Sequence, residues 1–290
     1  MNLRDTHTFT PSLLNEARFS YHRRASPSVV PANNQTPASL GFTGIVPDDP
    51  ANAGPPSIRI NGYTEVGNTI QGPQARFDNT WQYSDNLSWV KGNHSLKFGV
   101  EYLAYEQNQR FDFINNGVFI FDGNGTATNA VPQTPGITSQ PLNDFIHGYA
   151  SDVEQSNANR QGYRDKFLYA YAQDDWKVRR NFTLNLGVRW EYNAPLTELN
   201  DHLATFRPGQ QSSVFSDAPV GLVYAGDKGI SRSTYRRDLN NFGPRVGFAW
   251  TPAERITIRS GYGLFYDAPI SELTLQFLSQ APFGIQPDLT

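Results

Sequence analysis

Histidines and cysteines are the first residues to consider for metal, redox or nucleophilic chemistry. The histidines are His7, His22, His94, His147 and His202, and no two of them have the spacing that places metal ligands on one helix face. The chain has no cysteine, which excludes thiolate metal ligands, a cysteine nucleophile and a disulfide framework. We therefore expect no metal site and no cofactor.

Acidic side chains beside histidine could belong to a hydrolase triad. Asp201 precedes His202 and Asp144 lies near His147, but no serine occupies a nucleophile elbow. The segment 122–126, Asp-Gly-Asn-Gly-Thr, resembles the opening of a calcium loop but lacks the later acidic ligands, so a turn is favoured. We expect no catalytic residues, and the chain is not predicted to be an enzyme.

Charge and composition restrict the class of protein. With 24 basic and 27 acidic residues the net charge is -3, which argues against nucleic acid as the main partner. The longest apolar run is six residues, 167–172, whereas a membrane-spanning helix needs roughly 20. The N-terminus has no apolar segment of the secretory type. By contrast, 38 residues are aromatic, as expected of a chain that presents aromatic surfaces on strands.

Apolar and polar residues alternate with period two in several segments, which predicts strands. The clearest run is 182–192; 95–104 and 256–266 follow the same pattern, and 18–22 does so more weakly. Another strand-like segment comes before each of these runs. A break of three or four residues separates the two, for example Lys91-Gly92-Asn93-His94. Such breaks are typical of hairpins. We predict an all-β fold of about eight antiparallel strands in four hairpins, with 163–178 paired to 182–192.

The connections between hairpins are long, at about 25–79, 111–162 and 195–241. Alternating short turns and long loops are the organisation of an outer-membrane barrel. Ten residues of a tilted strand climb about 25 Å, the height of a lipid-facing band. We therefore predict one transmembrane barrel region over 1–290, an open arc of a larger barrel of the 22-strand type. The remaining alternative is a soluble β-sandwich, in which the apolar positions would be buried.

Strand parity predicts which side chains face lipid and which face the barrel lumen. The expected lipid-facing residues are Leu96, Phe98, Val100, Leu184, Leu186, Val188, Ile256 and Ile258. The expected lumen-facing residues are Lys97, Glu101, Arg189, Glu191 and Arg259, where Gly99, Gly187 and Gly261 would relieve crowding. Trp81, Trp89, Trp176, Trp190 and Trp250 lie near strand ends, as in the aromatic girdles at the two membrane interfaces.

Two acidic residues do not fit this parity. Asp85 falls between residues whose parity faces lipid, namely Trp81, Tyr83, Leu87 and Trp89, where a charge is costly, and Asp174 shares the parity of Trp176. Either a β-bulge shifts the register near them or their strands pair differently. Lys177, Arg179 and Arg180, beside Trp176, fit lipid-headgroup contact and a solvated turn equally well.

Five segments in order give the chain its resemblance to a known family. They are 6–19, 85–99, 171–178, 184–191 and 241–250, and they resemble TonB-dependent receptor barrels, most closely Oar-like receptors with a carboxypeptidase-regulatory-like domain. Such receptors also carry a signal peptide, a TonB box, a plug domain and an aromatic C-terminal residue. The sequence shows none of these, so we expect a partial barrel.

The resemblance implies a role in the outer membrane of a Gram-negative-type bacterium. A barrel segment of such a receptor would take up a bulky nutrient, namely a glycan, a peptide or a metal chelate. Its partners would be outer-membrane lipid, the unidentified nutrient and, through the plug of an intact receptor, the TonB complex. The alternative is a non-transporting surface-binding or structural β protein, whose long loops would carry its contacts.

Overall fold

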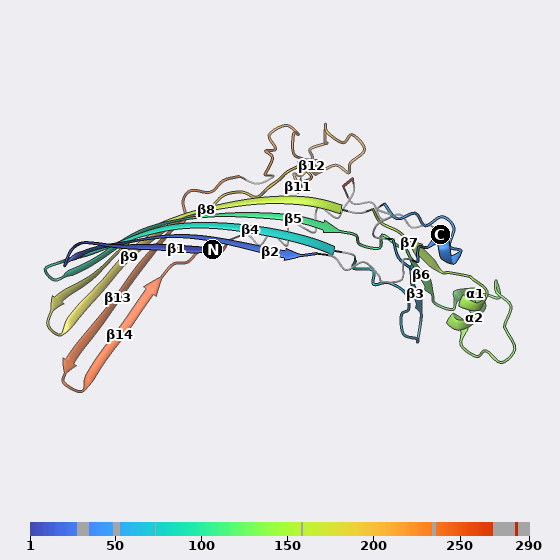
Figure 1. Cartoon of the computed structure of the whole chain (residues 1–290), viewed down its shortest axis with the longest axis horizontal. Helices are drawn as coiled ribbons and strands as arrows, with labels where there is room; N and C mark the ends of the chain where they lie inside the picture. The colour runs from blue at the N-terminus through green and yellow to red at the C-terminus, as the bar shows by residue number, and fades with distance from the viewer. Residues whose placement is uncertain are drawn as a thin grey trace. The chain divides into compact units, whose positions relative to one another are not determined.

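A computed structural model of the chain describes residues 1–27, 35–48, 53–72, 74–157, 159–233, 236–268 and 282–283. Its main feature is a twisted sheet of eight long strands in the order β1-β2-β4-β5-β8-β9-β13-β14 (Figure 1). The strands are β1 (Asn2–Thr10), β2 (Leu13–Ser26), β4 (Gln74–Lys91), β5 (His94–Phe111), β8 (Asn159–Arg179), β9 (Phe182–Asn193), β13 (Phe242–Ala253) and β14 (Ile256–Gly263). Within the described residues the path of paired strands begins at β1 and ends at β14, and these two do not pair with each other.

The eight strands form four hairpins, as the alternating pattern predicts. Each hairpin turns through only two residues: 11–12, 92–93, 180–181 and 254–255. The predicted pairing of 163–178 with 182–192 is confirmed, because β8 and β9 are antiparallel from Phe167↔Asn193 to Lys177↔Thr183. Gly92 has a φ of 59°, which suits the first position of a two-residue hairpin turn.

The two faces of the sheet differ in chemistry. Residues opposite each other in register share a face, because successive side chains of a strand alternate sides. One face carries Trp176, Leu184 and Phe248 in neighbouring strands, and we call it the apolar face. The other carries Tyr171, Arg189 and Gly243, and we call it the polar face.

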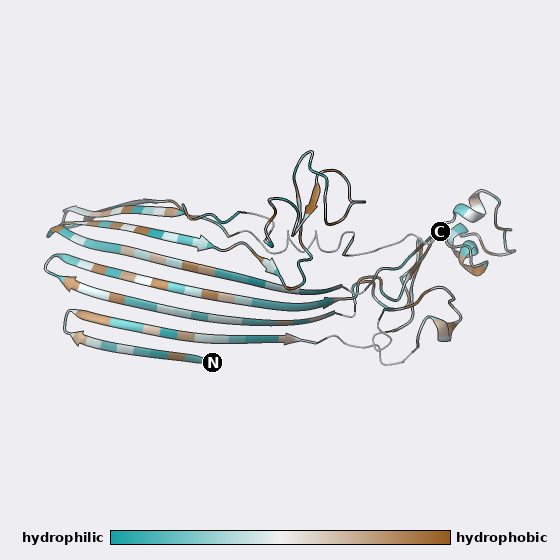
Figure 2. Cartoon of the chain, turned by 90° about the horizontal axis from the view of Figure 1, so that it is seen from above, coloured by the Kyte–Doolittle hydropathy of each residue, from teal (hydrophilic) through white to brown (hydrophobic). Residues whose placement is uncertain are grey.

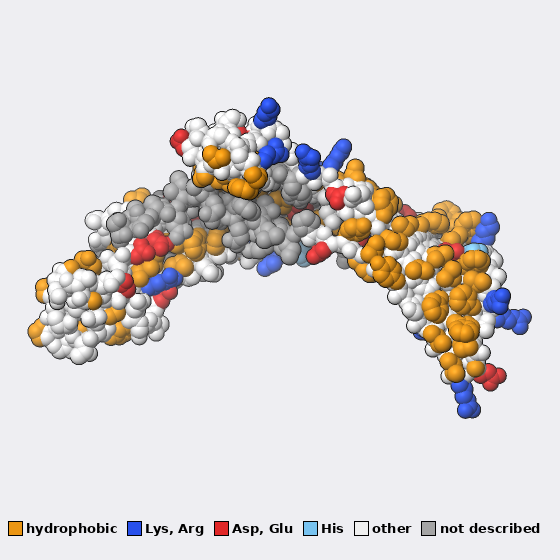
Figure 3. All heavy atoms as spheres, turned by 180° about the vertical axis from the view of Figure 1, so that it is seen from behind, with side chains coloured by type: hydrophobic (Ala, Val, Ile, Leu, Met, Phe, Trp, Pro, Cys, Tyr) orange, Lys and Arg blue, Asp and Glu red, His pale blue; other side chains and the backbone are white. Residues whose placement is uncertain are grey.

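The residues expected to face lipid are accessible. Phe98, Val100, Leu186, Val188, Ile256 and Ile258 are 40–53% exposed, and Leu96 and Leu184 are half-buried. Apolar side chains gather over the β9–β13–β14 part of the sheet (Figure 3). This exposure contradicts the sandwich alternative, in which a second sheet would bury these positions.

Several strands run further than the alternation indicates. β4 and β5 have 18 residues each and β8 has 21. Their loop-side ends are largely hydrophilic (Figure 2), so no apolar period marks them in the sequence. The first two connections between hairpins accordingly shorten to 27–73 and 112–158, and the third runs over 194–241.

The long connections contain folded elements of their own. The first two hold η1 (Ala38–Leu40), β3 (Ser57–Ile60), β6 (Val118–Phe121), α1 (Asn124–Ala127), α2 (Gln140–Ile146) and β7 (Asp152–Glu154). In these, β3 pairs in parallel with β6, and β6 is antiparallel to β7. The third holds β10 (Thr197–Glu198), which pairs with β8, and the hairpin β11 (Ala204–Phe206)–β12 (Leu222–Tyr224).

Contacts divide the chain into two compact units. The first comprises Met1–Arg24, Asp78–Gln107 and Gly162–Phe277, and the second Ala25–Phe77, Asn108–Gln161 and Leu278–Thr290. In the first unit the buried apolar side chains lie at Tyr163 and in the 194–241 connection, including Leu203 and Val223, rather than across the sheet. None of the helices among the described residues has the length and apolar character needed to cross a membrane.

Candidate functional site

The polar face carries a network centred on Arg189, midway along β9. Its guanidinium lies over the ring of Tyr169, 4.6 Å from the centroid, and its Nε donates to Glu191 Oε1 at 2.7 Å. The Tyr169 hydroxyl donates to Asn193 Oδ1 at 3.0 Å. The alternation of β8 and β9 places these side chains on one face, because Tyr169 pairs with Glu191 and Tyr171 with Arg189.

Strands β4 and β5 extend the same network. Gln82 Nε2 donates to the Glu101 carboxylate, and the Tyr171 hydroxyl donates to Asn86 Oδ1 at 2.8 Å. Together these strands form a small polar cavity of about 200 Å³, lined by Arg18, Gln82, Ser84, Asn86, Val100, Glu101, Tyr169, Tyr171 and Arg189. The cavity offers hydrogen-bond donors, acceptors, aromatic faces and charges of both signs, so it can hold a polar solute.

The structure brings together three of the five residues expected to line the lumen. Glu101, Arg189 and Glu191 belong to this network. Lys97 is exposed on β5, and Arg259 is exposed opposite Ala249 at the β14 end of the sheet. Neither of them joins the network within the described residues. The polar partners Gln82, Asn86, Tyr169 and Asn193 were not singled out in the sequence, although Tyr169 and Asn193 have the parity of Glu191.

Gly99, Gly187 and Gly261 were expected to relieve crowding on the polar face. This expectation is right for Gly99 and wrong for the other two. A β-carbon at Gly99 would overlap the Tyr171 ring and lie 2.6 Å from Asn86 Oδ1. At Gly187 and Gly261 the nearest atoms would be 3.4 and 3.6 Å away, which is ordinary van der Waals contact. Of these three glycines, only Gly99 therefore makes room for a neighbour, the Tyr171 ring.

The five tryptophans lie on the long strands, and contacts with neighbouring groups position them. Trp176 stacks on His94, with ring centroids 5.2 Å apart, and Lys91 Nζ lies 4.9 Å from the Trp89 ring. Trp250, which pairs with Ile258, is 42% exposed. Trp81 lies well inside β4 rather than near a strand end as expected, and it contacts Tyr21. Near the end of β9, Trp190 Nε1 donates to Leu239 O at 2.8 Å. Their function as interface girdles stays a prediction.

The register of β8 and β9 has no bulge beside Asp174, one of the two acidic residues that do not fit the parity. Asp174 pairs in register with Leu186, and the only shift between β8 and β9 lies further along, between Lys177 and Arg179. His94 Nδ1 lies 2.6 Å from Asp174 Oδ2. Asp85 Oδ1 accepts a hydrogen bond of 2.6 Å from Asn15 Nδ2. Both carboxylates thus lie on the apolar face and have a polar partner from a neighbouring strand.

Asp144 and His147, considered above as pieces of a hydrolase triad, bind other groups of the chain and not each other. Asp144 is fully buried and accepts from the backbone N–H groups of Gly125 and Thr126, at 2.9 and 2.7 Å. His147 Nε2 instead lies 3.0 Å from Thr134 Oγ1. Asp122 Oδ1 accepts from Asn124 N at 2.8 Å, so the start of segment 122–126 turns into the short helix α1. No group of three or more potential metal ligands occurs in the described part of the chain.

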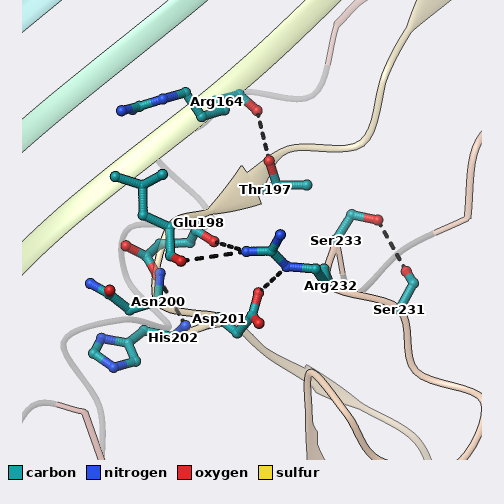
Figure 4. Close-up of polar contacts among 10 residues, drawn as sticks. Arg164, Thr197, Glu198, Asn200, Asp201, His202, Ser231, Arg232 and Ser233 are labelled. Carbon is teal, nitrogen blue, oxygen red and sulfur yellow. Dashed lines mark hydrogen bonds and ion pairs between the residues drawn. The ribbon is translucent and has the colours of Figure 1, made fainter.

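The 194–241 connection is organised by buried carboxylates. Glu198 is 1% exposed and accepts from the N–H group of Gly162. It also accepts from the N–H groups of Asn200 and His202, which lie beside it (Figure 4). Arg232 pairs with Asp201 and donates to Glu198 O at 3.2 Å, which fastens the far end of the connection to its start (Figure 4).

Asp227 forms the second anchor of this connection. It is 3% exposed and accepts five hydrogen bonds, from Ser212 Oγ, from Ser213 N and Oγ, from Val214 N and from Tyr224 N. Burial raises the pKa of this carboxyl, but the hydrogen bonds outweigh burial and hold its pKa below the ordinary value. Burial and the Asp227 charge raise the pKa of Tyr224.

Comparisons with known proteins place the chain in a family. Among solved structures, the open form of the ferric-catecholate import receptor Fiu from E. coli K12 is 12% identical with a TM-score of 0.38; the alignment covers 90% of this chain and 34% of that one. The chain thus spans about a third of that receptor's length. No curated protein matches the chain. The family model described as "Outer membrane beta barrel domain" matches residues 1–290. The chain therefore belongs to the outer membrane β-barrel domain family and is an outer-membrane protein.

Proposed function

We propose that the chain forms part of the wall of a TonB-dependent receptor that takes up a bulky nutrient. The apolar face contacts lipid, and the polar face, including Arg189, Glu101 and Glu191, lines the lumen. The observation that carries the proposal is the polar network on one face of the sheet, opposite a face with exposed apolar residues. A wall that guides a polar solute needs both surfaces on the same strands.

The resemblance of the sequence to TonB-dependent receptors implies what energises uptake and which class of nutrient is taken up. TonB-dependent receptors move glycans, peptides or metal chelates, and the TonB complex acts on them through a plug domain. The polar network suits such cargo, because it combines tyrosine faces, amides and charges of both signs. The proposed role is binding and passage, and no catalytic step is assigned to the chain.

Uptake in the native bacterium tests this function. Deletion of the gene is expected to abolish growth on one class of nutrient, and inactivation of TonB is expected to have the same effect. The double variant Arg189→Ala/Glu191→Ala should reduce uptake. The control Lys97→Ala should not, because Lys97 lies in the same sheet but outside the network.

Two results would contradict the proposal. Unchanged growth of the deletion strain on glycans, peptides and metal chelates would exclude nutrient uptake. Loss of surface adhesion with normal uptake would favour the alternative of a non-transporting surface-binding or structural protein.

A further inference from the structure

The β4–β5 and β8–β9 turns are basic, although the chain as a whole has a net charge of -3. Segments 88–94 and 176–182 contain no aspartate or glutamate, and their lysines and arginines are Lys91, Lys177, Arg179 and Arg180. All four side chains are exposed, and within the part of the chain that the structure describes none of them forms an ion pair. The counter-charge for these side chains must therefore come from outside the described residues.

Both turns lie at the end of the sheet where all four hairpins turn (Figure 1). Lys177 N donates to Asn93 O at 2.8 Å, so the β4–β5 turn lies against β8 close to the β8–β9 turn. In outer-membrane barrels the short turns lie on the periplasmic side. We therefore expect this barrel domain to present its basic turns to the phospholipid headgroups of the periplasmic leaflet.

A register shift places Lys177 and Arg179 on different faces of the sheet. Before the shift, Lys177 lies opposite Thr183 on the polar face, and after it Arg179 lies opposite Phe182. Phe182 stacks on Phe248 of the apolar face, with ring centroids 6.2 Å apart. Without the shift, two residues separated by one position would share a face. The shift therefore directs Arg179 to the apolar face, where the membrane lies.

Lys91 lies on the apolar face as well. Its Nζ is 4.9 Å from the centroid of the Trp89 ring, and Trp89 has the parity of Asp85, which lies on that face. Trp176 lies on the same face three residues before Arg179. Each of the two cations thus lies near a tryptophan at the end of its strand. In this position a long basic side chain reaches a headgroup while its aliphatic part contacts hydrocarbon.

The nearest acidic residues leave this positive charge in place. Asp174 Oδ2 lies 2.6 Å from His94 Nδ1, and Asp174 Oδ1 is buried. Asp175 belongs to the polar face. Glu254, in the neighbouring β13–β14 turn, is followed by Arg255, so that turn adds no net charge. An anion beside Arg179 is therefore attracted by the turns.

We propose that Arg179 and Lys91 bind the phosphate groups of anionic phospholipids at the periplasmic end of the apolar face. A guanidinium can donate two parallel hydrogen bonds to one phosphate, and a lysine ammonium adds a compact positive charge. An anionic headgroup is preferred over a zwitterionic one, because the ammonium of a zwitterion offsets its phosphate. The proposal rests on the lipid contact of the apolar face proposed above, and it does not depend on nutrient uptake.

Quenching by brominated lipid measures this binding. The intact outer-membrane protein is placed in phosphatidylcholine vesicles that contain either dibrominated phosphatidylglycerol or dibrominated phosphatidylcholine. Bromine on the acyl chains quenches tryptophans that it contacts, and the difference between each protein and its Trp176→Phe counterpart isolates the signal at this site. We expect several-fold tighter binding of phosphatidylglycerol than of phosphatidylcholine, and a smaller preference at high salt, because salt screens exposed charges.

Charge variants assign the preference to the apolar side of the turns. Arg179→Gln should reduce the preference for phosphatidylglycerol several-fold, Lys91→Gln should reduce it as well, and Arg179→Lys should retain most of it. Lys177→Gln is the matched control, since it removes an equally exposed charge two residues away on the polar face, and it should leave the preference unchanged.

Three results would overturn the proposal. Equal preferences in Arg179→Gln and Lys177→Gln, with normal quenching by brominated phosphatidylcholine, would mean that these turns are only solvated, and the wall function would stand. Loss of the preference when inorganic phosphate replaces chloride at constant ionic strength would show a site for free phosphate. Absence of quenching by either brominated lipid would show that lipid does not contact the apolar face, which would contradict the proposed wall function too.

Discussion

Gly99 is the residue on which the packing of the polar face depends most directly. Because a β-carbon there would overlap the Tyr171 ring, Gly99→Ala must displace the ring and break its hydrogen bond to Asn86. We expect the free energy of unfolding to fall by about 1–3 kcal/mol. Gly187→Ala is the matched control, since its β-carbon meets only ordinary contacts; it should be neutral or slightly stabilising. Urea unfolding of the intact outer-membrane protein in lipid vesicles, followed by tryptophan fluorescence, measures both, and equal stabilities would contradict the argument.

Asp227 is the residue on which the packing of the 194–241 connection depends. Its carboxylate satisfies three backbone N–H groups and two serine hydroxyls at a site with almost no solvent access. An asparagine there would present an amide N–H₂ to some of these donors. We expect Asp227→Asn to destabilise the connection by about 1–3 kcal/mol, because buried donors lose their acceptor. Faster hydrogen–deuterium exchange in residues 203–230, with unchanged exchange in β8 and β9, would show this.

The lowered pKa of Asp227 makes the stability of the 194–241 connection depend on pH. The pKa of this carboxyl is lowered in the folded state, so its contribution to stability is fully present above the unfolded value of about 4 and is lost as pH falls through the folded value. Protection of residues 203–230 should therefore decrease below about pH 4. Asp227→Asn removes the titrating group, and its protection should depend less on pH in this range. A variant with the full pH dependence of the native protein would show that another group is responsible.

At the scale of elements, the short turns set the register of the hairpins. Gly92 has a φ of 59° in the two-residue turn between β4 and β5, a conformation that strains residues with a β-carbon. In the intact outer-membrane protein, Gly92→Val should lower the yield of folded protein in vesicles, with a cost of about 1–2 kcal/mol. Asn93→Ala, the adjacent control, should have a smaller effect, because Asn93 is not in the left-handed region. Equal yields would mean that strand pairing alone fixes this turn.

Alternation and turn chemistry were sufficient to predict the strands and their pairing. Period two over 182–192 and the Gly92-Asn93 break predicted β9 and the β4–β5 turn, because a half-buried strand and a tight turn both restrict local sequence. The hydrophilic ends of β4, β5 and β8 were missed because neither of their faces is apolar. The pairing of β3 with β6 was missed as well, since it joins segments about 60 residues apart.

The site was only partly predictable for a related reason. Parity identified Glu101, Arg189 and Glu191 as neighbours on one face. It could not identify which neutral residues complete the network, because Tyr171 meets Asn86 across 85 positions of sequence. Nor could it show that His94 and Asn15 satisfy Asp174 and Asp85. Those contacts depend on the register between strands, which sequence spacing along one strand does not give.

At the scale of the whole molecule, the two edges of the sheet determine how the chain behaves alone. Strands β1 and β14 end the path of paired strands among the described residues, and β1 is exposed along its length. Unpaired edges present rows of free N–H and C=O groups, which hydrocarbon cannot satisfy and which promote association with other strands. The exposed apolar residues of β9, β13 and β14 increase this tendency.

Residues 1–290 refolded by themselves in detergent are therefore expected to be aggregated or sensitive to protease. Closure of eight strands into a small barrel would remove both edges, but such a barrel must fill its interior with side chains. The polar face offers Gly99, Gly187, Gly247, Gly261 and Gly263 along these strands, which leaves too little bulk for a narrow lumen. Size-exclusion chromatography, limited proteolysis and electrophoresis of heated and unheated samples measure the outcome. A monodisperse, protease-resistant species whose migration changes on heating would show that the eight strands close, because only a sheet without edges resists both dissociation and cleavage.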